Sequence, residues 1–152
     1  VLTLRLQDCL LKEVKFDCVE HLHSLQLDSC YFLERLSNLS CLKELRWLDI
    51  NGCPHLVDIE GLRELKYLQR LEVEDCDSIR RLPDLSRLKK LEKLRLRYCK
   101  SLESIPDVDE EMPCHLDIKH CHYFHNFRGP YSERHRAIKN EGEMALFWNL
   151  IY

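Results

Sequence analysis

A repeat of about 23 residues is the feature that most constrains what this chain can fold into. Six cysteines recur at intervals of 21, 23, 23, 23 and 22 residues, at Cys9, Cys30, Cys53, Cys76, Cys99 and Cys121. Apolar residues precede each cysteine by eight, five and three positions. The one exception is Pro113, eight positions before Cys121. From Cys30 on, apolar residues also follow it by three and six positions. The unit is L-x-x-L-x-L-x-x-C-x-x-L-x-x-L, which is typical of stacked repeats.

Each unit predicts one strand and a return path. The L-x-L segment alternates with period 2, so its leucines share one face of a strand. No single coil buries its leucines alone, whereas stacked coils share a continuous leucine core beneath a parallel sheet. Pro83 and Pro106 suit turns on the return path. The segments RELKYLQRL and SRLKKLEKL, at 63–71 and 86–94, are predicted to form about one turn of helix each on the convex side.

The period lies within the 20 to 29 residues of leucine-rich repeats. We therefore predict an α/β leucine-rich-repeat solenoid of about six repeats over residues 1–127, followed by a non-repeat C-terminal cap or tail at 128–152. In that tail, Gly129 and Pro130 predict a turn, and Ser132 suits the N-cap of a short helix. The apolar MALFWNLIY either covers the open end of the last coil or belongs to a frayed or truncated terminus.

The six repeating cysteines are predicted to be buried structural thiols that turn into the core just past each strand. Equivalent Cβ atoms in neighbouring parallel strands lie ~4.8 Å apart with parallel vectors, whereas a disulfide needs ~3.8 Å with converging ones. Disulfides between coils are therefore not expected. A core lined by free thiols suits a reducing compartment, so we expect a cytoplasmic or nucleocytoplasmic location. Cys18 and Cys41 lie on connecting segments, and no reactive surroundings can be read for them.

Composition limits the kinds of partner. The 152 residues are 45% hydrophobic and 32% charged with a net charge of −3. No basic excess indicates nucleic-acid binding, and no apolar run approaches the ~18 residues of a membrane span. The chain begins at Val1, already in register with the repeat, so we expect it to be a piece of a longer polypeptide.

The repeat phrases resemble a known family. The motif C-x-S-[IL]-x-x-[IL]-P-D occurs at 76–84 and again at 99–107, and DIEGLRELKYLQRLEV at 58–73 has a G-L-x-x-L-x-x-L phrasing. These phrases resemble the leucine-rich repeats of plant intracellular immune receptors, and most closely those of the TIR-type NB-LRR disease-resistance class, including the flax rust-resistance group. The resemblance covers residues 22–121 well, the first repeat loosely and the tail not at all.

The resemblance implies an irregular horseshoe with a concave parallel sheet. It implies a non-catalytic domain that recognises a protein ligand, either a pathogen effector or a host protein. It also implies an intramolecular contact that restrains a nucleotide-binding domain, and any ADP or ATP would belong to that domain, because this chain has no G-x-x-x-x-G-K-[ST] loop. Two alternatives remain open: an F-box-type substrate adaptor of a ubiquitin ligase, and a plain leucine-rich-repeat scaffold.

The binding residues are expected on the face opposite the strand leucines. The predicted partner-binding set is Trp47, Asp49, Arg70, Glu72, Glu74, Lys93, Arg95, Arg97 and Tyr98. A large aromatic beside charge is typical of a protein-binding anchor. The alternative is a surface whose groups satisfy one another. In that case Glu72 pairs with Arg95, Glu74 pairs with Arg97, and Trp47 stacks on Arg70.

Catalytic and metal chemistry find little support. The chain has no nucleophile elbow and no H-E-x-x-H motif, and we expect no enzyme activity. The stretch CHLDIKHCHYFH at 114–125 is rich in metal-ligating residue types. In the repeat register, however, Cys121 points inward while His115 and His120 point outward. Convergence on one metal ion would break the strand, and no metal site is expected.

Overall fold

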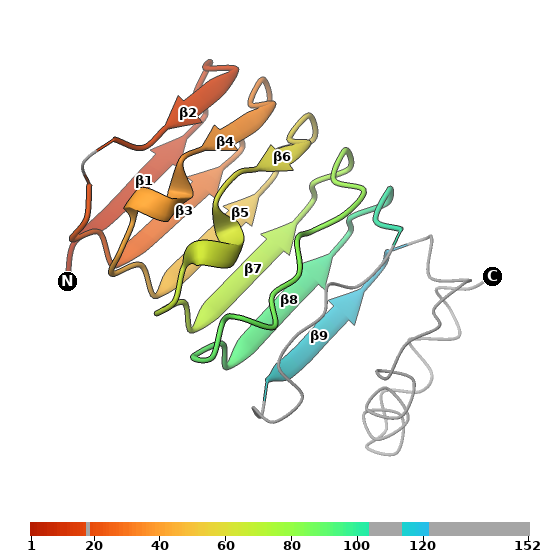
Figure 1. The fold of residues 1–152 in the computed structure, drawn as a ribbon. Coiled ribbons are helices and arrows are strands. Elements are labelled where there is room, and N and C mark those ends of the chain that lie inside the picture. Colours follow the sequence, from red (N-terminus) through yellow and green to blue (C-terminus); the bar gives the residue numbers. More distant parts are fainter. Residues whose placement is uncertain (18, 104–113, 122–152) are drawn as a thin grey trace.

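A six-stranded parallel sheet forms the front of the molecule. The computed structural model describes residues 1–17, 19–103 and 114–121. The strands stand side by side in sequence order across the solenoid (Figure 1), as β1 (Thr3–Gln7), β3 (Ser24–Asp28), β5 (Trp47–Asn51), β7 (Arg70–Glu74), β8 (Lys93–Arg97) and β9 (His115–Lys119). The predicted parallel solenoid is therefore confirmed, with six strands that bound five turns. The predicted tail at 128–152 lies outside the described residues.

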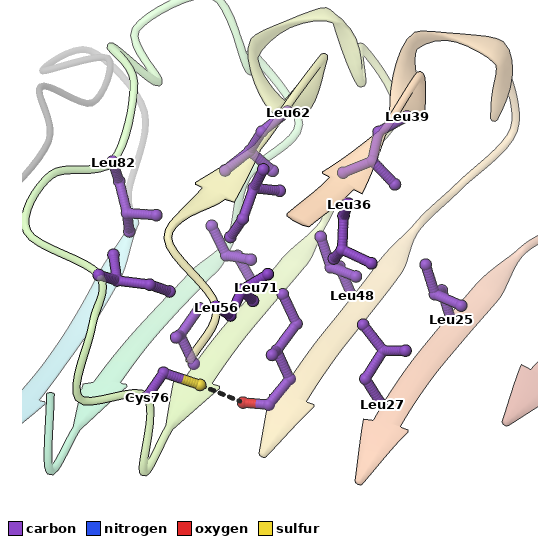
Figure 2. Close-up of a cluster of buried hydrophobic side chains, with 14 of the residues drawn as sticks. Leu25, Leu27, Leu36, Leu39, Leu48, Leu56, Leu62, Leu71, Cys76 and Leu82 are labelled. Atoms are coloured by element: carbon purple, nitrogen blue, oxygen red, sulfur yellow. Dashed lines mark hydrogen bonds between the residues drawn. The ribbon is translucent and has the colours of Figure 1, made fainter. Parts of the chain in front are cut away.

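The repeat register places equivalent residues beside one another in every strand pair. Leu25 pairs with Leu48, Leu48 with Leu71, and Leu71 with Leu94. All four leucines are fully buried, and Figure 2 shows such leucines filling the space behind the sheet. A one-residue slip would turn each leucine column to the outside, so burial fixes the register. Complete burial of one leucine side chain contributes about 1.5–3 kcal/mol.

A second parallel sheet lies behind the first, and sequence reasoning did not predict it. It has three short strands, β2 (Glu13–Lys15), β4 (Arg35–Ser37) and β6 (Asp58–Ile59), in that order. They form the other layer in Figure 1. Val14 pairs with Leu36, and Leu36 pairs with Ile59. Each back strand therefore presents one central apolar side chain to the core between polar neighbours.

The predicted helical component is absent from the described residues, which contain no α-helix. Two 3₁₀ turns, η1 (Leu39–Cys41) and η2 (Leu62–Glu64), follow β4 and β6. The segment 86–94 forms turns that lead into β8. The reason is the spacing of the buried leucines, which is three residues at Leu62, Leu65 and Leu68. A period of three fits 3₁₀ geometry, whereas an α-helix would carry the third leucine away from the core.

The second sheet ends at β6 because of a proline. Within this sheet the main-chain N–H of Glu60 donates to the carbonyl oxygen of Leu36 at 2.8 Å. Pro83 follows Leu82 as Glu60 follows Ile59, and proline has no N–H to donate. Leu82 still turns into the core, but the part of the chain that the structure describes has no fourth back strand.

Each strand of the front sheet ends in the same left-handed turn. The residue directly before each repeating cysteine has a positive φ, between 51° and 66°, at Asp8, Ser29, Gly52, Asp75, Tyr98 and His120. In the first five of these turns the main-chain N–H of this residue donates to the carbonyl oxygen of the last strand residue of the next coil. The N–H of Tyr98, for example, donates to the carbonyl oxygen of Lys119 at 3.0 Å. This turn reverses the side-chain direction, so that the cysteine that follows points into the core.

The cysteines behave as the sequence predicts. Five of the six repeating cysteines are buried, and Cys9, in the end coil, is half-buried. The Cys76 thiol donates to the carbonyl oxygens of Glu74 at 3.3 Å and Ile50 at 4.0 Å, the second of which is drawn in Figure 2. The eight cysteines of the described residues are all free thiols. Cys30, Cys76, Cys99 and Cys121 each donate in this way to a carbonyl oxygen of their own turn and to one of the coil before it.

Candidate functional site: the open face of the main sheet

The open face is the side of the front sheet that the strand leucines do not occupy. In β5, β7 and β8 the alternate residues point to this side, and all eight predicted strand positions from Trp47 to Arg97 are at least partly accessible there. Tyr98 follows β8 directly at its carboxyl end. The structure therefore brings the nine predicted residues to one surface. Their role in partner binding stays a prediction.

Glu72 is the centre of one half of an ion-pair network. Its carboxylate lies 3.2 Å from the Lys93 ammonium, 3.0 Å from Nη1 of Arg95 and 3.8 Å from Nε of Arg70. Glu72 and Arg95 are register partners on β7 and β8, so the predicted pairing of these two residues is confirmed. Three cationic groups thus converge on one carboxylate.

Asp117 is the centre of the other half. Its carboxylate accepts hydrogen bonds from Nε of Arg95 at 3.1 Å and from Nη2 of Arg97 at 2.6 Å, and the Lys119 ammonium lies 3.8 Å away. Arg95 therefore bridges Glu72 and Asp117 across three strands. The predicted binding set omits both Asp117 and Lys119, although they are the register partners of Arg95 and Arg97 on the last strand. We call these seven residues the ion-pair network: Arg70, Glu72, Lys93, Arg95, Arg97, Asp117 and Lys119.

Two pairings of the alternative in which the surface groups satisfy one another are wrong. That alternative pairs Arg97 with Glu74, its register partner, but the guanidinium reaches diagonally to Asp117. Trp47 and Arg70 are register partners, yet the described residues show no cation–π contact between them. Arg70 turns instead toward Glu72 on its own strand. In both cases a long arginine side chain reaches the carboxylate that gathers the most cations.

The network is layered, with acids below and cations above. The side chains of Glu72 and Asp117 are 15% and 10% exposed, whereas those of Lys93, Arg95, Arg97 and Lys119 are 24–28% exposed and that of Arg70 is 55% exposed. Even without Lys119, the four cationic groups of Arg70, Lys93, Arg95 and Arg97 outnumber the two carboxylates of the network. A molecule that approaches β8 and β9 therefore meets positive charge first.

The pKa of Asp117 reflects this environment. Burial by itself raises the pKa of a carboxyl group, but the hydrogen bond and charge of Arg97, together with Lys119 and Arg95, hold the pKa of Asp117 below its ordinary value. The same contact with Asp117 raises the pKa of Arg97. Asp117 is therefore ionised at neutral pH and fixes the cations around it.

The other half of the open face is acidic. On β3, β5 and β7 the outward residues include Asp28, Asp49 and Glu74, with Asp75 directly after β7. Asp28 pairs with Arg5 at 3.2 Å. Asp49 has no salt bridge among the described residues, and burial, followed by the charges of Glu72, Glu74 and Asp28, raises its pKa. The open face is thus electrically bipolar along the solenoid.

An aromatic stack borders the cationic half. The rings of Tyr98 and His120 lie with their centroids 4.6 Å apart and their planes 1° from parallel. Both residues occupy the left-handed turn after their strands. Tyr98 remains exposed, so the stack offers an apolar face next to Arg97. Trp47 is also exposed, at the opposite, amino-terminal end of β5.

Other kinds of site find no candidates in the described part of the chain. No three histidine, cysteine, aspartate or glutamate residues gather around a point where a metal ion would bind. No helix there is long and apolar enough to cross a membrane. Comparisons with protein-family models, with curated proteins and with solved structures found no match for this chain.

Proposed function

We propose that this chain is a non-catalytic protein-recognition domain that binds its partner through the open face of the main sheet. The observation that carries this proposal is the ion-pair network, in which cations cover two largely buried carboxylates. A surface that served only to satisfy its own charges would need no excess of cations. Exposed Trp47 and Tyr98 add the aromatic side chains that are enriched at protein interfaces.

The fold gives physical support to a recognition role. A stacked solenoid holds its front strands at a fixed spacing of ~4.8 Å, so the side chains of the open face form a regular, rigid array. Rigid arrays lower the entropy lost on binding. The inward leucines recur from coil to coil, which leaves the outward positions free to carry sequence-specific chemistry.

We further propose that the domain belongs to a plant intracellular immune receptor of the TIR-type NB-LRR class. The resemblance of the repeated phrases at 76–84 and 99–107 supports this assignment. In that setting the partner is a pathogen effector or a host protein. The domain also restrains a nucleotide-binding domain until the partner binds.

Site-specific photo-crosslinking in the cell of origin tests the open face. A photoreactive p-benzoylphenylalanine replaces Trp47 or Tyr98 on the open face, or Tyr67 as the control. Tyr67 is comparably exposed but lies in the segment that leads into β7, off this face. We expect one common adduct from the two open-face positions and none from Tyr67. The same adduct from all three positions, or no adduct from either open-face position, contradicts the proposed function.

A further inference from the structure

We infer that the cationic half of the open face docks an acidic, extended segment of the partner protein. This inference rests on the proposed function and assigns a chemistry to the partner. The docking groups are carboxylates presented by a polypeptide, and they lie over β7, β8 and β9.

The layering sets the sign of the charge that a partner meets. Glu72 and Asp117 lie at the bottom of the network, and the ammonium and guanidinium groups lie above them. Because the two carboxylates cancel only part of the positive charge, the outer layer still attracts anions. Charge complementarity of this kind directs both the encounter and the orientation of a partner.

The geometry of the cations is fixed before binding. Lys93, Arg95 and Arg97 are each held by a carboxylate within 3.2 Å. Ordering a long side chain at an interface ordinarily costs free energy, and the carboxylates beneath have already ordered these three. The planar guanidinium groups are also suited to bind carboxylates through two parallel hydrogen bonds.

Donors remain available for a partner. Arg95 donates Nε to Asp117 and Nη1 to Glu72, and Arg97 donates Nη2 to Asp117. A guanidinium carries five N–H donors. Nη2 of Arg95 and Nη1 of Arg97 therefore have no partner among the described residues and can hydrogen-bond an incoming carboxylate.

The size and polarity of the surface favour a short extended segment. Three strands at ~4.8 Å spacing and five residues at ~3.3 Å each outline an area of about 10 by 17 Å. This area accommodates a few extended residues and is small for a globular interface. Asp28 and Asp49 on the neighbouring strands, together with Glu74 at the carboxyl end of β7, repel acidic residues, so they confine the acidic end of the segment to the cationic half.

The experiment uses a fluorescein-labelled octaglutamate peptide as the probe, with octalysine and a Gly-Ser octapeptide as controls. Binding to the full chain is followed by fluorescence anisotropy at 50 and 300 mM salt. We expect octaglutamate alone to bind, with an affinity that falls at the higher salt concentration. Lys93→Gln should weaken binding about three- to fivefold, the range for one partly exposed ion pair.

The matched control is Lys66→Gln, which removes the same charge from an exposed position off the open face. It should leave the affinity for octaglutamate unchanged. Lys93→Gln is the informative variant because Arg95 and Arg70 still hold Glu72 when Lys93 is lost. Circular dichroism and the midpoint of urea unfolding show whether each variant keeps the fold.

Three results overturn the inference: no binding of octaglutamate, equal binding of octalysine, or equal weakening by Lys66→Gln. Displacement by inorganic phosphate beyond the effect of chloride at the same ionic strength also overturns it, because the site would then recognise phosphate. If octaglutamate does not bind while crosslinking at Trp47 and Tyr98 captures one partner, the acidic-segment inference is wrong and the proposed function is retained. If both fail, both are wrong.

Discussion

Tyr98 and His120 stack face to face, 4.6 Å between ring centroids, although 22 positions separate them in the chain. Each residue occupies the left-handed turn at the end of its strand, with φ of 52° and 56°. The repeat register sets this geometry, because equivalent positions on neighbouring parallel strands lie ~4.8 Å apart. A tyrosine at positive φ is uncommon and carries a conformational cost. The shared left-handed turn therefore places the two rings side by side.

Removal of both rings should cost less stability than the two single losses added together. We expect a coupling free energy of about 0.5–1.5 kcal/mol between Tyr98→Ala and His120→Ala. Each alanine also bears the strain of a positive φ, but the double-mutant cycle cancels this contribution. Urea unfolding of the native chain, the two single variants and the double variant measures the coupling free energy. Additive effects, within about 0.3 kcal/mol, would show that the rings do not interact.

Two glycines should differ sharply when alanine replaces them. Gly61 has a φ of 87°, and an added Cβ would lie 2.6 Å from the main-chain nitrogen of Ser40. Gly52 has a φ of 66°, and its added Cβ would lie 3.3 Å from the nitrogen of Ser29. We expect Gly61→Ala to lower the free energy of unfolding by about 2–4 kcal/mol, because it combines strain with overpacking.

Gly52→Ala should cost only about 1–2 kcal/mol, the strain of one left-handed residue, since five other repeats place a residue with a side chain in this turn. The two variants make the same chemical change, so each serves as the control for the other. Thermal or urea unfolding ranks them. Equal destabilisation would mean that the close approach of Gly61 to Ser40 does not constrain the coil.

The buried thiols should resist alkylation. Burial, with a smaller contribution from the hydrogen bond to Cys9, raises the pKa of the Cys30 thiol to about 12. The hydrogen bond to Cys53, together with burial, raises the pKa of Cys76. Because the thiolate is the reactive form, N-ethylmaleimide at pH 8 should modify the half-buried Cys9 and Cys41 well before Cys30 and Cys76. Peptide mapping by mass spectrometry gives the order in which the cysteines are modified. Early labelling of Cys76 would contradict its burial in the core.

Loss of the Asp117 carboxylate should destabilise the fold in a pH-dependent way. Asp117→Asn removes the carboxylate that pairs with Arg97 and with Nε of Arg95, although Arg95 still pairs with Glu72. We expect a loss of about 2–4 kcal/mol at pH 7, the scale for a broken, largely buried ion pair. The folded pKa of Asp117 is lowered, so its contribution is present above the unfolded value of about 3.9. That contribution disappears as the pH falls through the folded pKa.

The control is Asp77→Asn, whose carboxylate pairs with Lys100 at 3.1 Å on the exposed surface. It should change the stability by less than about 1 kcal/mol. Urea unfolding between pH 3 and 7 compares the two variants with the native chain. An Asp117→Asn penalty that stays constant down to pH 3 would show that the ionised carboxylate is not its source.

Asp49 should show the opposite sign. Its folded pKa is raised, by burial first and then by Glu72, Glu74 and Asp28. The folded state therefore holds a proton that the unfolded state releases, and stability falls as the pH rises through the interval between the two pKa values. Asp49→Asn should stabilise the chain at pH 7, and this gain should fade in acid. A destabilised variant at pH 7 would mean that Asp49 has a favourable contact.

The sequence was sufficient for the front of the solenoid because each prediction there rested on a repeated column. The L-x-L columns located the six front strands, and the cysteine column located the inward turn. Burial of residues such as Leu71 and Cys76 follows from these columns alone. Stacking gives equivalent positions of all coils the same environment. A residue type that recurs at one position in every coil therefore predicts whether that position is buried.

The back of the solenoid and the details of pairing depend on features that recur only in some coils. The second sheet has only one apolar residue per strand, such as Leu36 or Ile59, and Pro83 ends it. The three-residue spacing of Leu62, Leu65 and Leu68 was a readable signal for 3₁₀ turns. Register alone gives the direct partners of an arginine, but Arg97 reaches a diagonal one, Asp117.

The sequence of the transcript upstream of Val1 tests most directly the claim that joins this fold to its proposed function. The receptor assignment predicts a G-x-x-x-x-G-K-[ST] loop between a strand and a helix in the translated upstream region, with a further domain before it. The open face would then be the recognition surface of a nucleotide-dependent switch. An upstream region with no such loop would contradict the receptor assignment and would leave an adaptor or a scaffold built on the same leucine core.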